Sequence, residues 1–256
     1  KFIVIHYTGM KNENKAIEHG VKLLEEGAQI LDIGGESTRP GSQRVEIQEE
    51  IDRILPVIEG LKKYGACLSV DTRNAATMRA ALDAGASIIN DISALEYDSE
   101  SIFLAVGRQV PVILMHMQGS PDTMQENPSY NNVIEDIYVY LQKRIRACET
   151  AGIERKNVII DPGIGFGKTL EHNLLIHRNI SKFFDLGCNI LFGSSRKRFI
   201  ADLSKGESAN ERLAGSLSSV IWARSQGVNM FRVHDVKETV QALKVYDSIS
   251  AVSALR

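Results

Sequence analysis

The sequence is poor in cysteine and shows no excess of either charge. Its three cysteines, Cys67, Cys148 and Cys188, lie far apart and form no C-x-x-C pair, which argues against a disulfide framework and a zinc site. We therefore expect a cytoplasmic protein in a reducing environment. Thirty basic and 32 acidic residues leave a formal net charge of -2, so no overall field would attract nucleic acid or an anionic membrane. An anion site would have to be local.

Long apolar segments are also missing. No run approaches the roughly 20 apolar residues that a membrane-spanning helix needs. The short apolar start of the chain is followed by a polar stretch over residues 6–15, which is unlike a signal peptide. With 43% hydrophobic and 24% charged residues, the composition is near that of an average globular protein. We expect neither a membrane nor a nucleic acid as a partner.

The chain instead contains a repeated alternation of short apolar runs and longer amphipathic segments. The apolar runs predict strands over residues 2–5, 30–33, 67–70, 88–89, 112–115, 158–160, 189–192 and 230–233. Apolar residues at three- and four-residue spacing predict helices over residues 16–26, 47–61, 75–84, 133–151, 174–186, 212–225 and 236–246.

This order of strand and helix indicates a parallel sheet. The chain has 256 residues, close to the roughly 250 that are typical of a (β/α)₈ barrel. We therefore predict an α/β protein, a (β/α)₈ TIM barrel, with one domain over residues 1–256. An open, doubly wound sheet could also hold eight parallel strands and is the alternative.

Polar residues follow seven of the predicted strands. In a parallel barrel all these strand ends meet around one mouth, where barrel enzymes place their catalytic groups. Asp71-Thr72 and Asn90-Asp91 could each be a helix N-cap, but the recurrence after seven strands favours an active site. His116, between two methionines, is more often a packed histidine than a ligand.

Basic residues gather after the last two strands, which commonly supply the phosphate site of a barrel. We expect a local anion site there, with a solvated basic turn as the alternative for Arg198; the set comprises Arg196, Lys197, Arg198, Arg232 and His234. Residues 163–169 do not form a nucleotide-binding P-loop, because Pro162 stands where that motif requires glycine. No H-E-x-x-H spacing indicates a permanent transition-metal site.

Seven longer motifs begin at the predicted strand ends or just after them: Asp32-Ile-Gly-Gly-Glu-Ser-Thr-Arg-Pro-Gly41, Ser69-Val-Asp-Thr72, Asn90-Asp-Ile-Ser93, Met115-His-Met-Gln-Gly-Ser-Pro-Asp-Thr-Met-Gln125, Asp161-Pro-Gly-Ile-Gly-Phe-Gly-Lys168, Ser195-Arg-Lys197 and Arg232-Val-His-Asp-Val236. In this order they resemble the motifs of the dihydropteroate synthase family, from about Ala16 to the C-terminus.

The resemblance implies a transferase of folate biosynthesis and a target of sulfonamides. Such an enzyme condenses 6-hydroxymethyl-7,8-dihydropterin diphosphate with 4-aminobenzoate and releases diphosphate. It also implies Mg²⁺, shared with the diphosphate rather than held by protein ligands alone, and a homodimer formed through barrel helices near the C-terminus. Small molecules would be its substrates.

By the same resemblance, Asp71, Asp161 and Lys197 are the expected catalytic residues. Asn90 and Asp161 would bind the amino and ring-nitrogen edge of the pterin, with Lys197 on the other side of the ring. Asp71 would lie near the pterin and stabilise its cationic intermediate. Met115 would form an apolar wall.

The resemblance also assigns two further sets of residues. Arg232 and His234 would bind the diphosphate. The 4-aminobenzoate pocket would lie against Phe166 and Lys197 and beneath a loop that carries Thr38, Arg39 and Pro40.

One departure concerns the first strand. The family ends it with an Asn-Val-Thr-Pro-Asp-Ser-Phe-Ser loop, whose asparagine contributes to the diphosphate and Mg²⁺ site, and no such segment follows Ile5 here. No metal ligand can therefore be named. Either the protein lacks this loop or the printed chain omits it between Ile5 and His6, and we favour the omission.

Two other functions share part of this pattern. A pterin-dependent methyltransferase barrel would share Asp71, Asn90 and Asp161 but would not need the basic motifs that begin at Ser195 and Arg232. A catalytically silent paralogue, which binds a pterin or a protein without turnover, is compatible with the missing asparagine.

Overall fold

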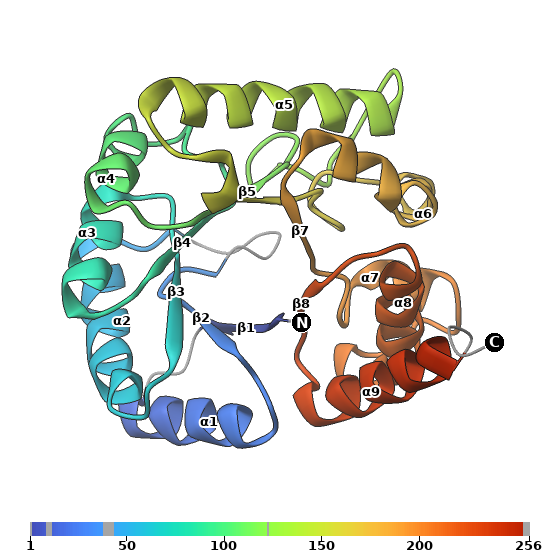
Figure 1. Cartoon of the computed structure of the whole chain (residues 1–256), viewed down its shortest axis with the longest axis horizontal. Coiled ribbons are helices and arrows are strands. Elements are labelled where there is room, and N and C mark those ends of the chain that lie inside the picture. Colours follow the sequence, from blue (N-terminus) through green and yellow to red (C-terminus); the bar gives the residue numbers. More distant parts are fainter. Residues whose placement is uncertain (1, 9–11, 38–43, 122, 253–256) are drawn as a thin grey trace.

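Eight parallel strands close into a barrel. The computed structural model describes residues 2–8, 12–37, 44–121 and 123–252 (Figure 1). The strands pair in chain order, and β8 returns to β1, where Met230 pairs with Phe2. They are β1 (Phe2–Thr8), β2 (Ile30–Gly34), β3 (Cys67–Asp71), β4 (Ile88–Asp91), β5 (Val112–Met115), β6 (Val158–Asp161), β7 (Asn189–Phe192) and β8 (Met230–Arg232). The predicted barrel is confirmed and the open sheet is excluded.

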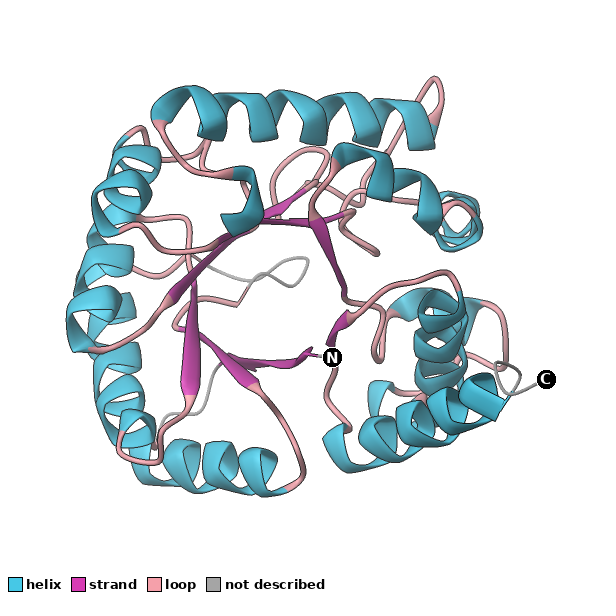
Figure 2. Ribbon diagram, in the orientation of Figure 1, coloured by secondary structure: helices cyan, strands magenta, loops and turns pink. Residues whose placement is uncertain are grey.

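Helices form a ring outside the strands (Figure 2). They are α1 (Glu13–Glu25), α2 (Ile47–Lys62), α3 (Ala75–Ala84), α4 (Glu100–Arg108), α5 (Val133–Ala151), α6 (Leu170–Arg178), α7 (Arg198–Asp202), α8 (Leu213–Ser225) and α9 (Val236–Val252). None of the described helices is both long and apolar enough to cross a bilayer.

Local sequence signals set the ends of several helices. At the start of α5, Asn132 Oδ1 accepts hydrogen bonds from the Ile134 and Glu135 N–H groups. At its end, Gly152 has a φ of 111°, a left-handed conformation that favours glycine. That turn leads the chain back toward β6 within a few residues.

The helix predicted over residues 174–186 is wrong at both ends. Helix α6 begins after Thr169, which forms a capping box with His172, and it ends at Arg178. Residues Ile180–Leu186 form a 3₁₀ helix instead. Helices α4 and α7 were not predicted, because segments of nine and five residues are too short for the helical period to stand out.

Strand β1 is longer than predicted. His6, Tyr7 and Thr8 pair with Asp32, Ile33 and Gly34 of β2, so the described strand runs through the point where an additional segment is expected. That segment remains a prediction about the expressed protein.

The core has two parts, one on each side of the barrel wall. The larger part lies between the strands and the helices and includes Leu68, Phe183 and Phe231. The smaller part lies inside the barrel and, among the side chains that the structure describes, comprises Ile30, Ile88, Ile113, Ile159, Leu191 and Met230. This inner apolar layer fixes which residues face the mouth.

Candidate active site

A polar layer lies directly above the inner apolar layer. Side chains alternate across a strand, so the residue two positions after an inward-facing one also faces inward. Counting two positions from five of the six apolar residues gives Asp32, Asn90, Met115, Asp161 and Arg232. The sixth, Leu191, leads to Gly193. Four of the five predicted site residues that the strands carry are therefore placed together by strand geometry, and Asp71, the fifth, pairs in register with Asn90.

Asp32 contacts two other members of this layer and was given no role from the sequence. It is fully buried, accepts a hydrogen bond of 3.1 Å from Asn90 Nδ2, and lies 3.2 Å from Arg232 Nη2. The sequence contained one signal for this role: Asp32 stands two residues after Ile30, as Asn90 stands two residues after Ile88. Its contacts with residues of β4 and β8 could be recognised only from the closed barrel.

Asp161 lies on the other side of Arg232. Its Oδ1 accepts a hydrogen bond of 2.8 Å from the Gly163 N–H, and its Oδ2 lies 3.6 Å from Arg232 Nη1. Burial raises the pKa of Asp161, although Arg232 and the Gly163 N–H act in the opposite direction. Burial alone would lower the pKa of Arg232, but Asp32, Asp161 and Asp71 raise it, so its guanidinium stays charged.

Several polar atoms of the barrel interior make no hydrogen bond to a described residue. They include Asn90 Oδ1, Ser69 Oγ, Arg232 Nε and Arg232 Nη2, all of them buried. Buried polar atoms in native proteins usually have partners, and unpartnered ones at a barrel mouth indicate a ligand site. Here an amide acceptor and guanidinium donors remain for a ligand.

The capping alternative is wrong, because Asn74 and Ser99 are the N-caps of α3 and α4, but two of the residues concerned stabilise turns. Asp91 Oδ1 accepts from the Ser93 N–H at 2.7 Å and its Oδ2 from the Leu95 N–H at 3.1 Å, so it stabilises a turn. Thr72 likewise accepts from the Asn74 N–H. Asp71 ends β3 and is buried, and Asn90 bonds to Asp32 inside the barrel. These two belong to the candidate site.

The basic set after β7 and β8 is smaller than the sequence suggested. Arg196 Nε lies 3.1 Å from Asp235 Oδ2, so its charge is compensated. Arg198 faces solvent, with 88% of its side chain exposed, as expected for a solvated turn. The other members are Arg232, Lys197 and His234. The backbone N of His234 lies 3.2 Å from Ser195 Oγ, and its Nδ1 lies 3.1 Å from the same oxygen.

Phe166 and Lys197 form a pair beside Asp161. The Lys197 Nζ lies 4.1 Å from the centre of the Phe166 ring, a cation–π distance. Lys197 also acts electrostatically on Asp161. Two residues predicted to bind the second substrate are therefore in contact. Thr38, Arg39 and Pro40, which were expected to complete that pocket, lie outside the described residues.

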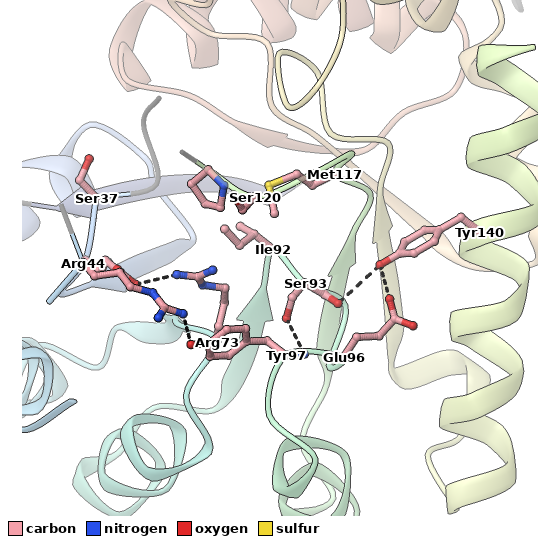
Figure 3. Close-up of a pocket in the computed structure, with 13 residues that line it drawn as sticks. Ser37, Arg44, Arg73, Ile92, Ser93, Glu96, Tyr97, Met117, Ser120 and Tyr140 are labelled. Atoms are coloured by element: carbon pink, nitrogen blue, oxygen red, sulfur yellow. Dashed lines mark hydrogen bonds and ion pairs between the residues drawn. The ribbon is translucent and has the colours of Figure 1, made fainter. Parts of the chain in front are cut away.

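A separate cavity of about 530 Å³ is lined by residues of the segments that follow β2, β3, β4 and β5 (Figure 3). Within it the Arg73 guanidinium lies 3.3 Å from Glu36 and 4.7 Å from the centre of the Tyr97 ring. The Tyr140 hydroxyl donates to Glu96 at 2.9 Å. Its charged groups thus have partners within the cavity, and none of its lining residues belongs to the polar layer.

Comparison with known proteins gives the family. A family model described as pterin binding enzyme matches residues 6–234. The chain belongs to this family. Dihydropteroate synthase of Haemophilus influenzae is 44% identical over 237 residues, which are 92% of this chain and 85% of the relative. The enzyme of the same name from Escherichia coli K12 is 41% identical over 234 residues, 91% and 82% of the two chains. The match begins at residue 6, earlier than the expected start near Ala16.

Solved structures of this pterin binding family share the barrel. Yersinia pestis dihydropteroate synthase, in a sulfonamide complex, is 37% identical with a TM-score of 0.93, covering 98% of this chain and 95% of that one. The Xanthomonas albilineans enzyme in complex with 7,8-dihydropteroate is also 37% identical, with a TM-score of 0.88 and coverage of 98% and 94%.

Proposed function

We propose that the polar layer binds the pterin in a transferase of folate biosynthesis. The enzyme condenses 6-hydroxymethyl-7,8-dihydropterin diphosphate with 4-aminobenzoate and forms dihydropteroate and diphosphate. The observation that carries the site assignment is the convergence of Asn90, Asp161 and Arg232 in one buried layer. Relatives with the same barrel are named for this reaction.

The layer is matched to an edge rich in hydrogen-bond donors. Asp32 is bonded to Asn90 Nδ2, and an ionised carboxylate can only accept, so Asn90 Oδ1 is the atom left for the ligand. Asp161 supplies carboxylate oxygens beside it. The 2-amino group and ring N–H of a pterin would satisfy both residues. Asp32 would thus act through Asn90, as a positioning residue.

Charge separation would drive the chemical step. The bond between the pterin methylene and the diphosphate oxygen breaks, the aniline nitrogen bonds to the methylene, and that nitrogen loses a proton. Because an aniline is a weak nucleophile, the gain comes from stabilising the departing anion and the developing cation. Arg232 and His234 would face the anion, and Asp71 the cation. The charged state of Arg232 supports this arrangement.

The second substrate would lie against the Phe166–Lys197 pair. A phenyl wall suits the ring of 4-aminobenzoate, and an ammonium group suits an anionic ligand. Lys197 lies between this wall and Asp161, so it would contact both substrates. Thr38, Arg39 and Pro40 keep their proposed role in closing this pocket.

Mg²⁺ is proposed only as a companion of the diphosphate. The described residues contain no group of three or more His, Cys, Asp or Glu side chains placed to hold a metal. They therefore do not fit a metal held by protein ligands. An ion bound mainly through substrate oxygens would suit Mg²⁺, which usually keeps several waters.

A homodimer is proposed on the outer face of α6, α7 and α8. These helices line an open groove in which Leu174, Leu203 and Trp222 are 39%, 55% and 48% exposed. A patch of large apolar side chains on one face is typical of a protein–protein interface. A cytoplasmic location is proposed with it, since all three cysteines are free.

Calorimetry tests the proposal without turnover. We expect 6-hydroxymethylpterin to bind to the protein alone and 4-aminobenzoate to bind in the presence of diphosphate and Mg²⁺. Tight binding of a methylated folate together with no binding of diphosphate would instead indicate a methyltransferase. Binding of pterin alone, without diphosphate or 4-aminobenzoate, would indicate a silent paralogue.

A further inference from the structure

Lys168 is a buried lysine that the proposed reaction does not use. Its side chain is almost fully buried, at 3% exposure. The Nζ has three acceptors: His116 Nδ1 at 3.0 Å, the His116 carbonyl at 3.3 Å and the Phe166 carbonyl at 2.9 Å. Three acceptors match the three N–H donors of the ammonium form, and burial lowers the pKa of Lys168 to about 7, so this form exists below neutral pH and shares the population with the neutral amine near it. The residue is thus held in one place by two segments of the chain.

His116 is fixed as an acceptor. Burial and the nearby Lys168 lower the pKa of His116 to about 2, so its ring is neutral. Nδ1 accepts from the ammonium form of Lys168, since an ammonium group can only donate. The ring packs edge-on against Tyr140, with centres 5.0 Å apart, and tilted against Tyr130 at 5.9 Å. The sequence-based expectation of a packed histidine agrees with this position.

Lys168 joins the segments that follow β5 and β6. These segments touch closely: a Cβ on Gly163 would lie 1.9 Å from the His116 carbonyl oxygen, and one on Gly167 2.5 Å from that of Gln118. The Lys168 side chain links the two segments, because it donates hydrogen bonds to His116 of one segment and to Phe166 of the other. The backbone at Phe166 is therefore tied to the end of β5.

We propose that Lys168, clamped by His116, is a positioning residue that fixes the Phe166–Lys197 wall for the second substrate. The Phe166 ring, whose carbonyl Lys168 holds, lies 4.1 Å from Lys197 Nζ. A Cβ on Gly165, in the same loop, would lie 3.2 Å from Lys197 Cδ, so movement of this loop changes the position of Lys197. The inference rests on the proposed function, since it assigns Phe166 and Lys197 to 4-aminobenzoate.

The test compares the two ligands in one variant. Lys168→Met keeps much of the apolar stem but removes the donor. We expect the KM for 4-aminobenzoate to rise about ten-fold, the change that about 1.4 kcal/mol represents, while the affinity for 6-hydroxymethylpterin stays within about two-fold. Lys156→Met, at an exposed lysine paired with Glu154, is the matched control and should change neither. Parallel changes for both ligands, or no change, would overturn the proposal.

Two substitutions of His116 decide the matter if Lys168→Met does not fold. His116→Phe keeps a ring between the tyrosines but removes the acceptor, whereas His116→Gln retains a side-chain acceptor. The KM for 4-aminobenzoate should rise more in His116→Phe than in His116→Gln, and equal values would overturn the positioning role. Wild-type calorimetry separates the two claims: if neither ligand binds, the proposed function fails, and if both bind, only the role of Lys168 is at stake.

Discussion

The substitution Asp161→Asn tests the acceptor character of the pterin site. The asparagine Oδ1 can still accept from the Gly163 N–H, as Asp161 Oδ1 does at 2.8 Å. The new amide N–H₂ then takes the place of Oδ2, 3.6 Å from Arg232 Nη1, where donor faces donor. In this variant a pterin N–H would also face the N–H₂ donor of the new asparagine. A buried group left unmatched costs about 1–3 kcal/mol, so the affinity for pterin should fall about 5- to 150-fold.

Calorimetry with 6-hydroxymethylpterin measures this loss directly. Asp83→Asn is the matched control, because Asp83 also pairs with an arginine, Arg108, but on the surface. We expect the control to bind pterin as the wild type does. Both variants should keep the wild-type affinity for 4-aminobenzoate within about two-fold, which is about 0.4 kcal/mol. Equal pterin affinity in Asp161→Asn and wild type would refute the placement of the pterin on Asp161.

Three further predictions concern charge, pH and assembly. Arg232→Ala should weaken binding of diphosphate more than binding of 6-hydroxymethylpterin in calorimetry, because only the former carries charge to pair with the guanidinium; equal losses would assign Arg232 to the fold. Burial raises the pKa of Asp91 from 3.8 to about 6, so ionisation costs more in the folded state and the free energy of unfolding should fall by about 3 kcal/mol as the pH rises through this interval. Urea unfolding of Asp91→Asn should lack this fall, and the same pH dependence in both proteins would contradict it. Trp222→Glu should convert a dimer into a monomer in analytical ultracentrifugation, and an unchanged dimer would place the interface elsewhere.

Strand periodicity explains why much of the site could be predicted. Asp71, Asn90 and Asp161 each directly follow a short apolar run and Arg232 lies within one, and a parallel barrel brings such positions to one mouth. These polar residues at the ends of apolar runs were visible in the chain. Their closeness required only the closed topology, which the repeat of strand and helix predicted.

The unpredicted features depend on pairings between distant residues. Asp32 bonds to Asn90, 58 positions away, and Lys168 bonds to His116, 52 positions away. No local pattern in the sequence predicts hydrogen-bond partners that lie so far apart in the chain. The ion pair of Arg196 was not predicted for the same reason, because its partner Asp235 lies 39 positions along the chain.

The condensation itself is the most direct test of the account. Purified protein is incubated with 6-hydroxymethyl-7,8-dihydropterin diphosphate, radiolabelled 4-aminobenzoate and Mg²⁺, and dihydropteroate and diphosphate are both quantified. The site built on Asn90, Asp161 and Arg232 predicts that the two products form in equal amounts. Release of diphosphate without labelled dihydropteroate, or no product although both ligands bind, would contradict it.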